Sequence, residues 1–411
     1  MTQHVGVIGA GIIGVTAARA LQRAGDKVTL FDPNEPGAAC SFGNAGHIAI
    51  DHVQPLARPD VLRSLPRLLF DPLGPLCLKW AGLPRLTPWL MRFAEAAKPS
   101  KVEAGTEALG ALLLLAKAAW ADEIAASRLA DLFRHRGSLV IFESDRALRE
   151  GHEESKILAR HGVRLEMLGA DAAKERLPAL ARSIAGGRYY PDTAHTVDPH
   201  RLVLELAERV TAEGGAFDRA AVTEIEIEGG LVRSVVAGDR RHQLDKLVLA
   251  AGAGAGMLAK RLGASAPLTR ERGYHAMLAP ESLALDLPIT FADRGFVATP
   301  MTAGVRLAGT VELGAGKAPD WRRADILLTH MRELFGRPFT STDRWMGDRP
   351  TLPDYLPMIG PAPLARNAML ALGHQHLGLT LAAVTGRLVA ALFADAPLAL
   401  DLSPFRADRF R

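Results

Sequence analysis

Three glycines close to the N-terminus have the spacing of a phosphate-binding turn. Gly9, Gly11 and Gly14 stand as G-x-G-x-x-G after a short apolar run, and Asp32 ends the next apolar run. The first glycine permits a tight turn, the second lets a pyrophosphate approach the backbone, and the third allows a helix to pack closely on a strand. Asp32 is placed to accept hydrogen bonds from ribose hydroxyls. The sequence therefore predicts a dinucleotide site, although the motif alone does not distinguish FAD from NAD.

An arginine near the other end of the chain could bind an acid. Arg349 directly precedes Pro350 within residues 345–360, and we expect the proline to hold it in a rigid turn. A fixed guanidinium suits a carboxylate, which it can clamp by two parallel hydrogen bonds. An ordinary surface arginine is the alternative. Tyr274 and His47 are weaker candidates for lining the same pocket, and for Tyr274 a solvent-facing position is equally open.

These residues need elements that bring them together. Residues 5–8 and 28–31 predict buried parallel strands, and the amphipathic pattern between them predicts a helix that ends at Gly25. The free N–H groups and the dipole of that helix would face the phosphates. The loop over residues 33–45 follows Asp32 directly, so we expect it beside the cofactor, with Ser41 and Asn44 as hydrogen-bond donors. An ordinary surface loop is the alternative.

Composition excludes several classes of protein. The chain has 411 residues, 48% hydrophobic and 23% charged, which is typical of a globular chain with a large core. The net charge is +4, but no basic run carries interleaved aromatics, so we expect no nucleic-acid partner. Two cysteines exclude a disulfide framework, and no Cys/His cluster indicates a metal. We expect neither a signal peptide nor a membrane span, because the longest apolar stretch, residues 377–393, contains Arg387 and indicates a buried helix.

The middle of the chain predicts a second, mixed α/β region. Residues 51–100 combine prolines with apolar residues and predict short helices joined by turns. This segment could cap a site or lie on a membrane with Trp80, Trp89 and Phe93 inserted, and packing against the protein is the alternative. Helices are predicted over residues 104–134, 146–161, 201–212 and 323–335. Strands are predicted over residues 138–142, 163–168, 221–227, 231–236 and 246–252, and alternating runs within residues 267–345 predict a mixed sheet.

The glycine motif, Asp32 and the run Ser41-Phe-Gly-Asn-Ala-Gly46 together resemble the opening of the D-amino-acid dehydrogenases. These belong to the FAD-dependent amine and amino-acid oxidoreductases, which include D-amino-acid oxidase, glycine oxidase and sarcosine oxidase. The resemblance extends over the whole chain and is strongest in the first 46 residues and the last 65 or so. It implies FAD rather than NAD. It also implies non-covalent binding, because Cys40 does not stand at a position known for flavin attachment.

The resemblance also implies which residues contact the cofactor. Residues 373–374 and 377–380 resemble the turn and helix N-terminus that face the flavin pyrimidine ring, where a positive helix end stabilises negative charge. Val222 would contact the adenine through its backbone, and Ala251 and Gly252 would lie near the phosphates and ribose. The full implied set is Gly9, Gly11, Ile12, Ile13, Gly14, Asp32, Pro33, Ser41, Asn44, Ala45, Gly46, Val222, Ala251, Gly252, Gly373, His374, Leu377, Gly378, Leu379 and Thr380.

The implied fold is α/β with two discontinuous domains. A Rossmann-like FAD-binding domain would comprise residues 1–50, 198–266 and 346–411. An α+β substrate domain on a mixed sheet would comprise residues 51–197 and 267–345. In the family the arginine before the proline binds the substrate carboxylate, so the resemblance assigns that role to Arg349.

The resemblance implies oxidation of the Cα–N bond of a D-amino or imino acid, by hydride transfer to flavin N5. Electrons would pass to a respiratory or other non-oxygen acceptor. Residues 191–195 and 378–385 are similar to members acting on D-proline or cis-4-hydroxy-D-proline. The alternatives are an oxidase of glycine- or sarcosine-type amines, a non-catalytic FAD electron-transfer subunit, and an NAD-dependent dehydrogenase. We expect a cytoplasmic protein, with peripheral contact to the inner face of the membrane and oligomerisation left open.

Overall fold

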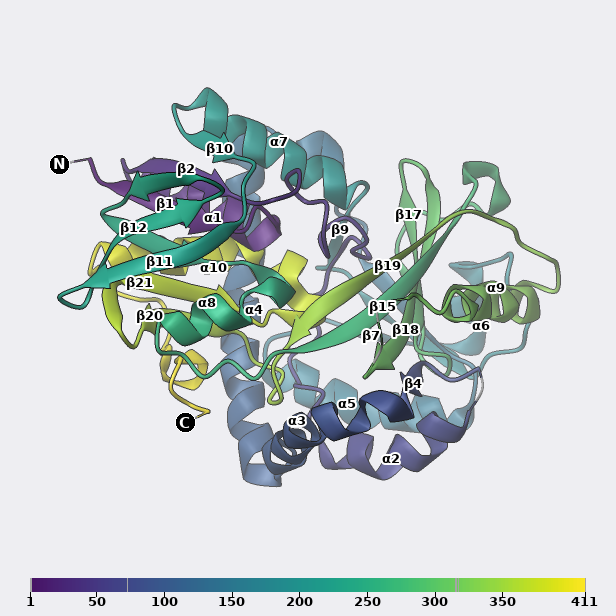
Figure 1. Cartoon of the computed structure of the whole chain (residues 1–411). Helices are drawn as coiled ribbons and strands as arrows, with labels where there is room; N and C mark the ends of the chain where they lie inside the picture. Colours follow the sequence, from purple (N-terminus) through teal and green to yellow (C-terminus); the bar gives the residue numbers. More distant parts are fainter. Residues whose placement is uncertain (1, 72, 315, 317, 411) are drawn as a thin grey trace.

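Two large β-sheets organise the chain, one in each half of the molecule (Figure 1). The computed structural model describes residues 2–71, 73–314, 316 and 318–410. The first sheet has six strands in the order β10-β2-β1-β14-β21-β20. Its parallel strands are β1 (His4–Ile8), β2 (Lys27–Phe31), β10 (Ala216–Asp218), β14 (Lys246–Leu249) and β21 (Ala365–Leu372), and β20 (Met358–Ala362) runs antiparallel to β21.

Helices from distant parts of the sequence pack together beside this sheet. They are α1 (Ile12–Arg23), α4 (Pro99–Ser127), α7 (Pro199–Ala212) and α10 (Gly378–Phe393). Helices α1 and α10 touch at Gly386, where a Cβ would lie 2.6 Å from the Thr16 carbonyl oxygen. The Thr16 hydroxyl also donates to the Ala382 carbonyl at 2.9 Å. Helix α4 is tied to α10 by Trp120, whose indole N–H donates to the Leu379 carbonyl at 2.9 Å.

One helical stretch in the described part of the chain, Gln375–Phe393, is long and apolar enough to cross a membrane by length and composition. It is nevertheless 61% buried inside the protein, where α1 and α4 pack on it. The sequence prediction of a buried helix at residues 377–393 is therefore confirmed.

The second sheet has nine strands, in the order β19-β15-β18-β17-β16-β6-β8-β7 with β4 beside β18. Both parallel and antiparallel pairs occur in it. The two long strands β15 and β19 extend from this sheet toward the first half of the molecule (Figure 1). Its strands are β4 (Leu76–Leu78), β6 (Ser138–Phe142), β7 (Glu166–Gly169), β8 (Gly186–Tyr190), β15 (Thr269–Leu278), β16 (Ile289–Phe291), β17 (Phe296–Met301), β18 (Gly304–Leu313) and β19 (Ser341–Thr351).

Smaller elements complete the fold. Two three-stranded sheets are β11 (Val222–Glu228), β12 (Leu231–Ala237) and β13 (Arg240–Gln243), and β3 (His47–Ile48), β9 (Ala194–Thr196) and β5 (Phe133–Arg134). The remaining helices are α2 (Pro59–Phe70), α3 (Leu83–Ala96), α5 (Asp145–Arg160), α6 (Ala170–Glu175), α8 (Gly256–Arg261) and α9 (Arg322–Phe335). Short 3₁₀ turns are η1 (Trp80–Gly82), η2 (Ala130–Leu132), η3 (Gly252–Gly254), η4 (Pro280–Ser282), η5 (Gln375–Leu377) and η6 (Ser403–Phe405).

The α/β class with a mixed second sheet is confirmed, and several local expectations need correction. Arg349 and Pro350 do not form a turn but lie inside β19, where the proline fits near the end of an edge strand. In residues 51–100, packing against the protein holds for Trp89 and Phe93, which are buried against Tyr355, whereas Trp80 is 64% exposed. The helix expected at residues 104–134 begins earlier and ends at Ser127. Strand β19 crosses the domain boundary predicted at residue 346, and the predicted domain limits stay predictions.

Candidate active site

The glycine turn has the shape that its sequence predicts. Gly9 has φ +106°, and a Cβ there would lie 2.5 Å from the Ala250 carbonyl oxygen. A Cβ on Gly14 would lie 1.8 Å from the Gly9 carbonyl oxygen, so only glycine permits this approach of α1 to β1. At Gly11 the nearest atom to such a Cβ is the Ser41 hydroxyl at 3.3 Å, which leaves room beside the backbone. The turn is therefore an open cradle at the N-terminus of α1.

Asp32 and Ser41 hold the edge of this cradle. The Asp32 carboxylate accepts hydrogen bonds from the Ala10 N–H at 3.0 Å and the Asn34 N–H at 2.9 Å. These bonds fix an acceptor that retains free lone pairs for ribose hydroxyls. The Ser41 hydroxyl oxygen accepts from the Ile12 N–H at 3.0 Å, so its own hydrogen stays available for donation.

A cavity of about 590 Å³, here called the dinucleotide cavity, runs from this cradle to the start of α10. Fifteen predicted cofactor contacts line it: Gly9, Gly11, Ile12, Ile13, Asp32, Pro33, Ser41, Asn44, Val222, Ala251, Gly252, Gly373, His374, Gly378 and Leu379. The residues come from six stretches separated by up to several hundred positions. Their convergence on one cavity fits an extended dinucleotide.

The other five predicted contacts lie elsewhere. Gly14 packs beneath the turn. Gly46, with φ +75°, packs against the Thr196 carbonyl oxygen, and Thr380 accepts a hydrogen bond from the Ala49 N–H at 3.0 Å. These three therefore support the cavity wall rather than line it. Ala45 and Leu377 line a second cavity instead.

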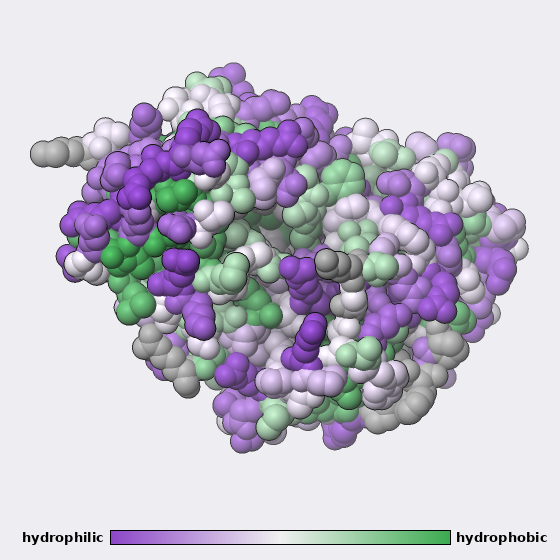
Figure 2. Space-filling model, in the orientation of Figure 1, coloured by the Kyte–Doolittle hydropathy of each residue, from purple (hydrophilic) through white to green (hydrophobic). Residues whose placement is uncertain are grey.

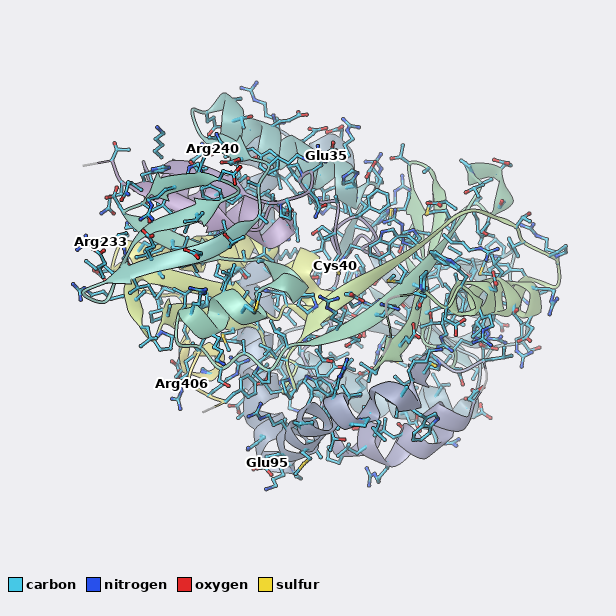
Figure 3. All side chains as sticks on the ribbon, viewed as in Figure 1. Glu35, Cys40, Glu95, Arg233, Arg240 and Arg406 are labelled. Atoms are coloured by element: carbon cyan, nitrogen blue, oxygen red, sulfur yellow. The ribbon has the colours of Figure 1, made fainter. Side chains whose placement is uncertain are left out.

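That second cavity, here called the inner cavity, has a volume of about 510 Å³. It shares five lining residues with the dinucleotide cavity: Cys40, Asn44, Trp345, Gly347 and Gln375. Figure 2 shows this face of the molecule hollowed between its two halves, and Figure 3 places Cys40 at the middle of the molecule. A molecule in the inner cavity would thus meet one end of a molecule in the dinucleotide cavity.

Arg349 lies on the wall of the inner cavity, where neighbouring residues hold its guanidinium in place. Because β15 and β19 pair in register, it stands opposite Glu271, and its Nη1 donates to Glu271 Oε1 at 3.2 Å. The other carboxylate oxygen, Oε2, accepts from the hydroxyls of Thr351 at 3.1 Å and Tyr355 at 3.0 Å. A Cβ on Gly273 would lie 2.4 Å from Arg349 Nη2, so the glycine makes space for the guanidinium. Arg349 keeps donors free for an incoming carboxylate.

Tyr274 also lines the inner cavity, but its hydroxyl is already engaged. The hydroxyl donates to the Glu312 carboxylate and accepts from the Asp320 N–H at 2.9 Å. Burial and the bond to Glu312 raise the pKa of Tyr274 to about 12. The side chain is thus a neutral part of an internal network that includes Lys79, 2.8 Å from Asp320. A direct contact of its hydroxyl with substrate stays a prediction.

The two predicted histidines, His47 and His374, are uncharged. His47 lines the inner cavity, where burial lowers its pKa to about 4, and among the described residues its Nε2 has no hydrogen-bond partner. His374 lines the dinucleotide cavity and shares a hydrogen bond with the Thr385 hydroxyl at 3.0 Å. Burial lowers the pKa of His374 to about 3. Among the described residues no group of histidines, cysteines or carboxylates could hold a metal ion.

Sequence reasoning missed two residues at the junction of the cavities. Trp345 stacks on His275 with ring centroids 5.3 Å apart, and Cβ atoms on Gly43 and Gly347 would each collide with its ring. Gln375 has φ +45°, and its Nε2 donates to the Tyr355 carbonyl at 2.5 Å. Its Oε1 is buried and has no partner in the part of the chain that the structure describes. In the sequence, only Gly43 and Gly347 hinted that a large ring, that of Trp345, packs against the backbone here. Gln375 had no signal beyond its place beside His374.

The cavity residues fit FAD. The cradle, the anchored Asp32 carboxylate and the small residues 251–252 match what a pyrophosphate and ribose require, and the N-terminus of α10 faces the far end of the cavity. Burial raises the pKa of the Cys40 thiol to about 11, so this cysteine is protonated at the junction.

Comparison with known proteins gives consistent results. Residues 4–392 match a sequence model of the family described as FAD dependent oxidoreductase. The chain is 35% identical to a D-amino-acid oxidase of Bradyrhizobium diazoefficiens, over 99% of both chains. It is 31% identical to a D-amino acid dehydrogenase of Paramagnetospirillum magneticum, over 98% of both. A crystal structure of glycine oxidase from Geobacillus kaustophilus superposes over the full length of both chains with a TM-score of 0.79 and 21% identity.

Proposed function

The chain belongs to the family of FAD-dependent oxidoreductases, and from that premise we propose that it oxidises the Cα–N bond of D-amino acids. The main support for the proposal is the position of Arg349. Its guanidinium lies on the inner cavity, and that cavity shares five lining residues with the cavity for FAD. Relatives named D-amino-acid oxidase and D-amino acid dehydrogenase support the substrate class.

In this proposal Arg349 binds the substrate carboxylate. Glu271 keeps the guanidinium in place through one nitrogen, which leaves the remaining donors for the substrate. The Cα–N bond then lies toward the junction, where Trp345, Asn44 and Gln375 close the space. FAD, when bound non-covalently, supplies the two-electron acceptor for the Cα hydride. The protein contributes mainly position, because holding the reactants in a reactive geometry removes much of the entropic barrier.

We also propose D-proline and cis-4-hydroxy-D-proline as members of the substrate range. The proposal rests on the similarity of residues 191–195 and 378–385 to enzymes of such imino acids. Among the described residues, neither Asp192 nor His195 lines the inner cavity. Asp192 instead pairs with Lys117 and Arg164 near the surface. Any effect of residues 191–195 on substrate choice would act through neighbouring residues. One of these neighbours is His47 of β3, which pairs with His195 of β9.

An anaerobic absorbance titration tests the function. The purified protein should be yellow, and D-amino acids, but not their L-isomers, should bleach the flavin band. The panel should include D-proline, cis-4-hydroxy-D-proline, glycine and sarcosine. Bleaching only by glycine or sarcosine would favour the amine oxidase. A yellow protein that no amine bleaches would favour an electron-transfer subunit, and a colourless protein that takes up no FAD would contradict the assignment.

The electron acceptor is proposed to be a quinone-type or other non-oxygen acceptor. After substrate reduction, admission of air should reoxidise the flavin slowly, whereas a soluble quinone analogue should do so quickly. Rapid oxygen consumption with hydrogen peroxide formation would assign the protein as an oxidase instead.

We propose a cytoplasmic location with peripheral membrane contact through the segment around α3. Trp80 in η1 is 64% exposed and Met91 in α3 is 68% exposed, and α3 also carries the exposed residues Arg85 and Arg92. Exposed apolar side chains beside cations suit an anionic lipid surface. Sedimentation with vesicles rich in phosphatidylglycerol should carry the protein down, and the double variant Trp80→Ser/Met91→Ser should stay in solution. Equal sedimentation of both proteins would contradict the contact.

A further inference from the structure

We propose that His376 and His52 form a proton relay that carries the ammonium proton of the substrate from the inner cavity to solvent. The proposal rests on the proposed function and adds to it a route for the proton. An amino acid reaches the enzyme with a protonated amine near neutral pH, and hydride can leave Cα only once the nitrogen has a free lone pair. Arg349 binds the carboxylate in this scheme and has no capacity to accept a proton.

The two histidines connect the cavity to the surface. His376 belongs to η5, one residue beyond Gln375, and lines the inner cavity together with Arg349. Its Nε2 lies 3.2 Å from Nδ1 of His52, within hydrogen-bond distance, and the ring centroids are 5.3 Å apart. The side chain of His52 is 46% exposed, so the second ring meets water. Asp51 Oδ2 lies 3.8 Å from the outer nitrogen of His52, Nε2.

Each end of the pair has a nitrogen available for the next transfer. Within the described part of the chain, Nδ1 of His376 has no hydrogen-bond partner, so it can accept a proton. Asp51 also lines the inner cavity and is 8% exposed, and no residue outside the gaps in the described ranges bonds its Oδ1. A carboxylate beside a half-exposed imidazole stabilises the imidazolium that forms when the proton arrives.

Burial and nearby positive charge keep His376 neutral in the resting protein. Burial lowers the pKa of His376 well below its usual range, and His52 and the positive charge of Arg349 act in the same direction. His47, the other histidine of this wall, is also neutral because burial lowers its pKa to about 4. A neutral His376 has the lone pair that a relay needs, and it does not hold the proton that it receives. The Asp51 side chain lies 3.8 Å from the outer nitrogen of His52 and favours movement of the proton outward.

The transfer balances without any further reactant. The substrate N–H bond breaks as an N–H bond forms at Nδ1 of His376, and the proton on Nε2 of His376 passes to Nδ1 of His52. His52 then releases its Nε2 proton to water, with Asp51 beside it. The substrate amine keeps the electron pair, and no electron is transferred in this step. Oxidation of Cα follows. After the product has left, water in the inner cavity takes the Nδ1 proton of His376, whose Nε2 regains a proton from Nδ1 of His52, and Nε2 of His52 takes one from bulk water.

The variants His52→Gln and His376→Gln test the relay in the FAD-loaded enzyme. Both keep a polar side chain but cannot transfer a proton. At neutral pH we expect kcat/KM for flavin reduction to fall about a hundredfold, in the range of a lost acid–base group. Above the pKa of the substrate amine, the substrate arrives neutral and the variants should approach the wild-type rate. Added imidazole should restore His52→Gln in part, because that site opens to water.

His152→Gln is the matched control, since His152 is exposed on α5 and its Nδ1 forms a hydrogen bond with the Leu148 carbonyl of the same helix at 2.9 Å. In the His52→Gln and His376→Gln variants, a merely structural effect would change the absorbance of bound FAD or the affinity for the carboxylate benzoate. We expect both quantities to stay as in the wild type. Variants that lose activity equally at all pH values, or lose none, would overturn the relay. A wild type that no amino acid reduces would instead overturn the proposed function, and the relay with it.

Discussion

Replacement of Arg349 by methionine should separate substrate binding from folding. The methionine keeps an unbranched apolar stem against Gly273 but removes the cation from the inner cavity. Each charge-assisted hydrogen bond to a carboxylate contributes about 1.5–3 kcal/mol. Loss of two such bonds should therefore weaken substrate capture by about 3–6 kcal/mol, or roughly 10²- to 10⁴-fold in kcat/KM. FAD uptake should be unchanged, because Arg349 is not among the residues that line the dinucleotide cavity.

The same variant leaves a buried carboxylate behind. Glu271 is 3% exposed, and Arg349 is the cation at its Oε1. Removal of one partner of a fully buried pair costs about 3–5 kcal/mol. The cost here should be smaller, about 2 kcal/mol, because the hydroxyls of Thr351 and Tyr355 still bond Oε2 and the arginine is 21% exposed.

A double variant distinguishes the two effects. Arg349→Met/Glu271→Gln should regain most of the lost free energy of unfolding in urea titrations, because no unpaired charge remains. It should not regain flavin reduction by D-amino acids. Arg344→Met is the matched control, since Arg344 lies on the same strand but pairs with Asp325 at the surface. Wild-type kcat/KM in Arg349→Met would refute the role of Arg349. Recovery of activity in the double variant would show that Glu271, not the substrate, needs the cation.

Three further predictions concern the cofactor, acid stability and helix packing. Gly14→Ala should abolish FAD uptake, seen as a colourless protein, since its Cβ would lie 1.8 Å from the Gly9 carbonyl oxygen; Gly256→Ala, with open space around it, should stay yellow. The free energy of unfolding should fall as the pH drops from 6.5 toward 3. In this range the histidines of the unfolded chain become protonated, whereas buried His374 and His275 stay neutral, because each has a pKa of about 3 in the folded protein. Each of the two histidines contributes up to about 1.4 kcal/mol per pH unit in that window. The free energy of unfolding of His275→Gln, measured in urea, should therefore change less steeply with pH than that of the wild type, and an unchanged slope would contradict this. Gly386→Ala should lower the free energy of unfolding by about 1–3 kcal/mol through its clash with α1, and calorimetry showing no change in Tm would refute that packing.

The local parts of the site could be predicted closely from the sequence. Gly9, Gly11, Gly14 and Asp32 act within one strand–turn–helix–strand unit of about 30 residues, where backbone stereochemistry and hydrophobic period leave few alternatives. The structure builds this unit as predicted. The long apolar stretch of α10 was likewise predictable as buried, because Arg387 interrupts it.

Predictions failed where a residue's setting depends on distant segments. Arg349 was singled out as a carboxylate ligand, but the turn expected around it is a strand. Its position follows from pairing with Glu271, 78 residues earlier. For Trp89 and Phe93 the sequence left membrane insertion and packing against the protein as alternatives. The fold decided for packing, since an apolar helix face is covered by the segment that the fold brings to it, here Tyr355.

The sequence by itself determined the dinucleotide unit, because that unit depends on contacts between near neighbours in the chain. It also indicated the α/β class, and it singled out Arg349 as the candidate carboxylate ligand. Only the tertiary structure decided that two cavities meet at Trp345 and Gln375, and that His52 reaches His376 across 324 positions. Such pairings depend on sheet register and helix packing, which sum many weak contacts over the whole chain. A sequence pattern records which side chains can do chemistry, and the packed fold sets which of them stand within 3–4 Å of each other.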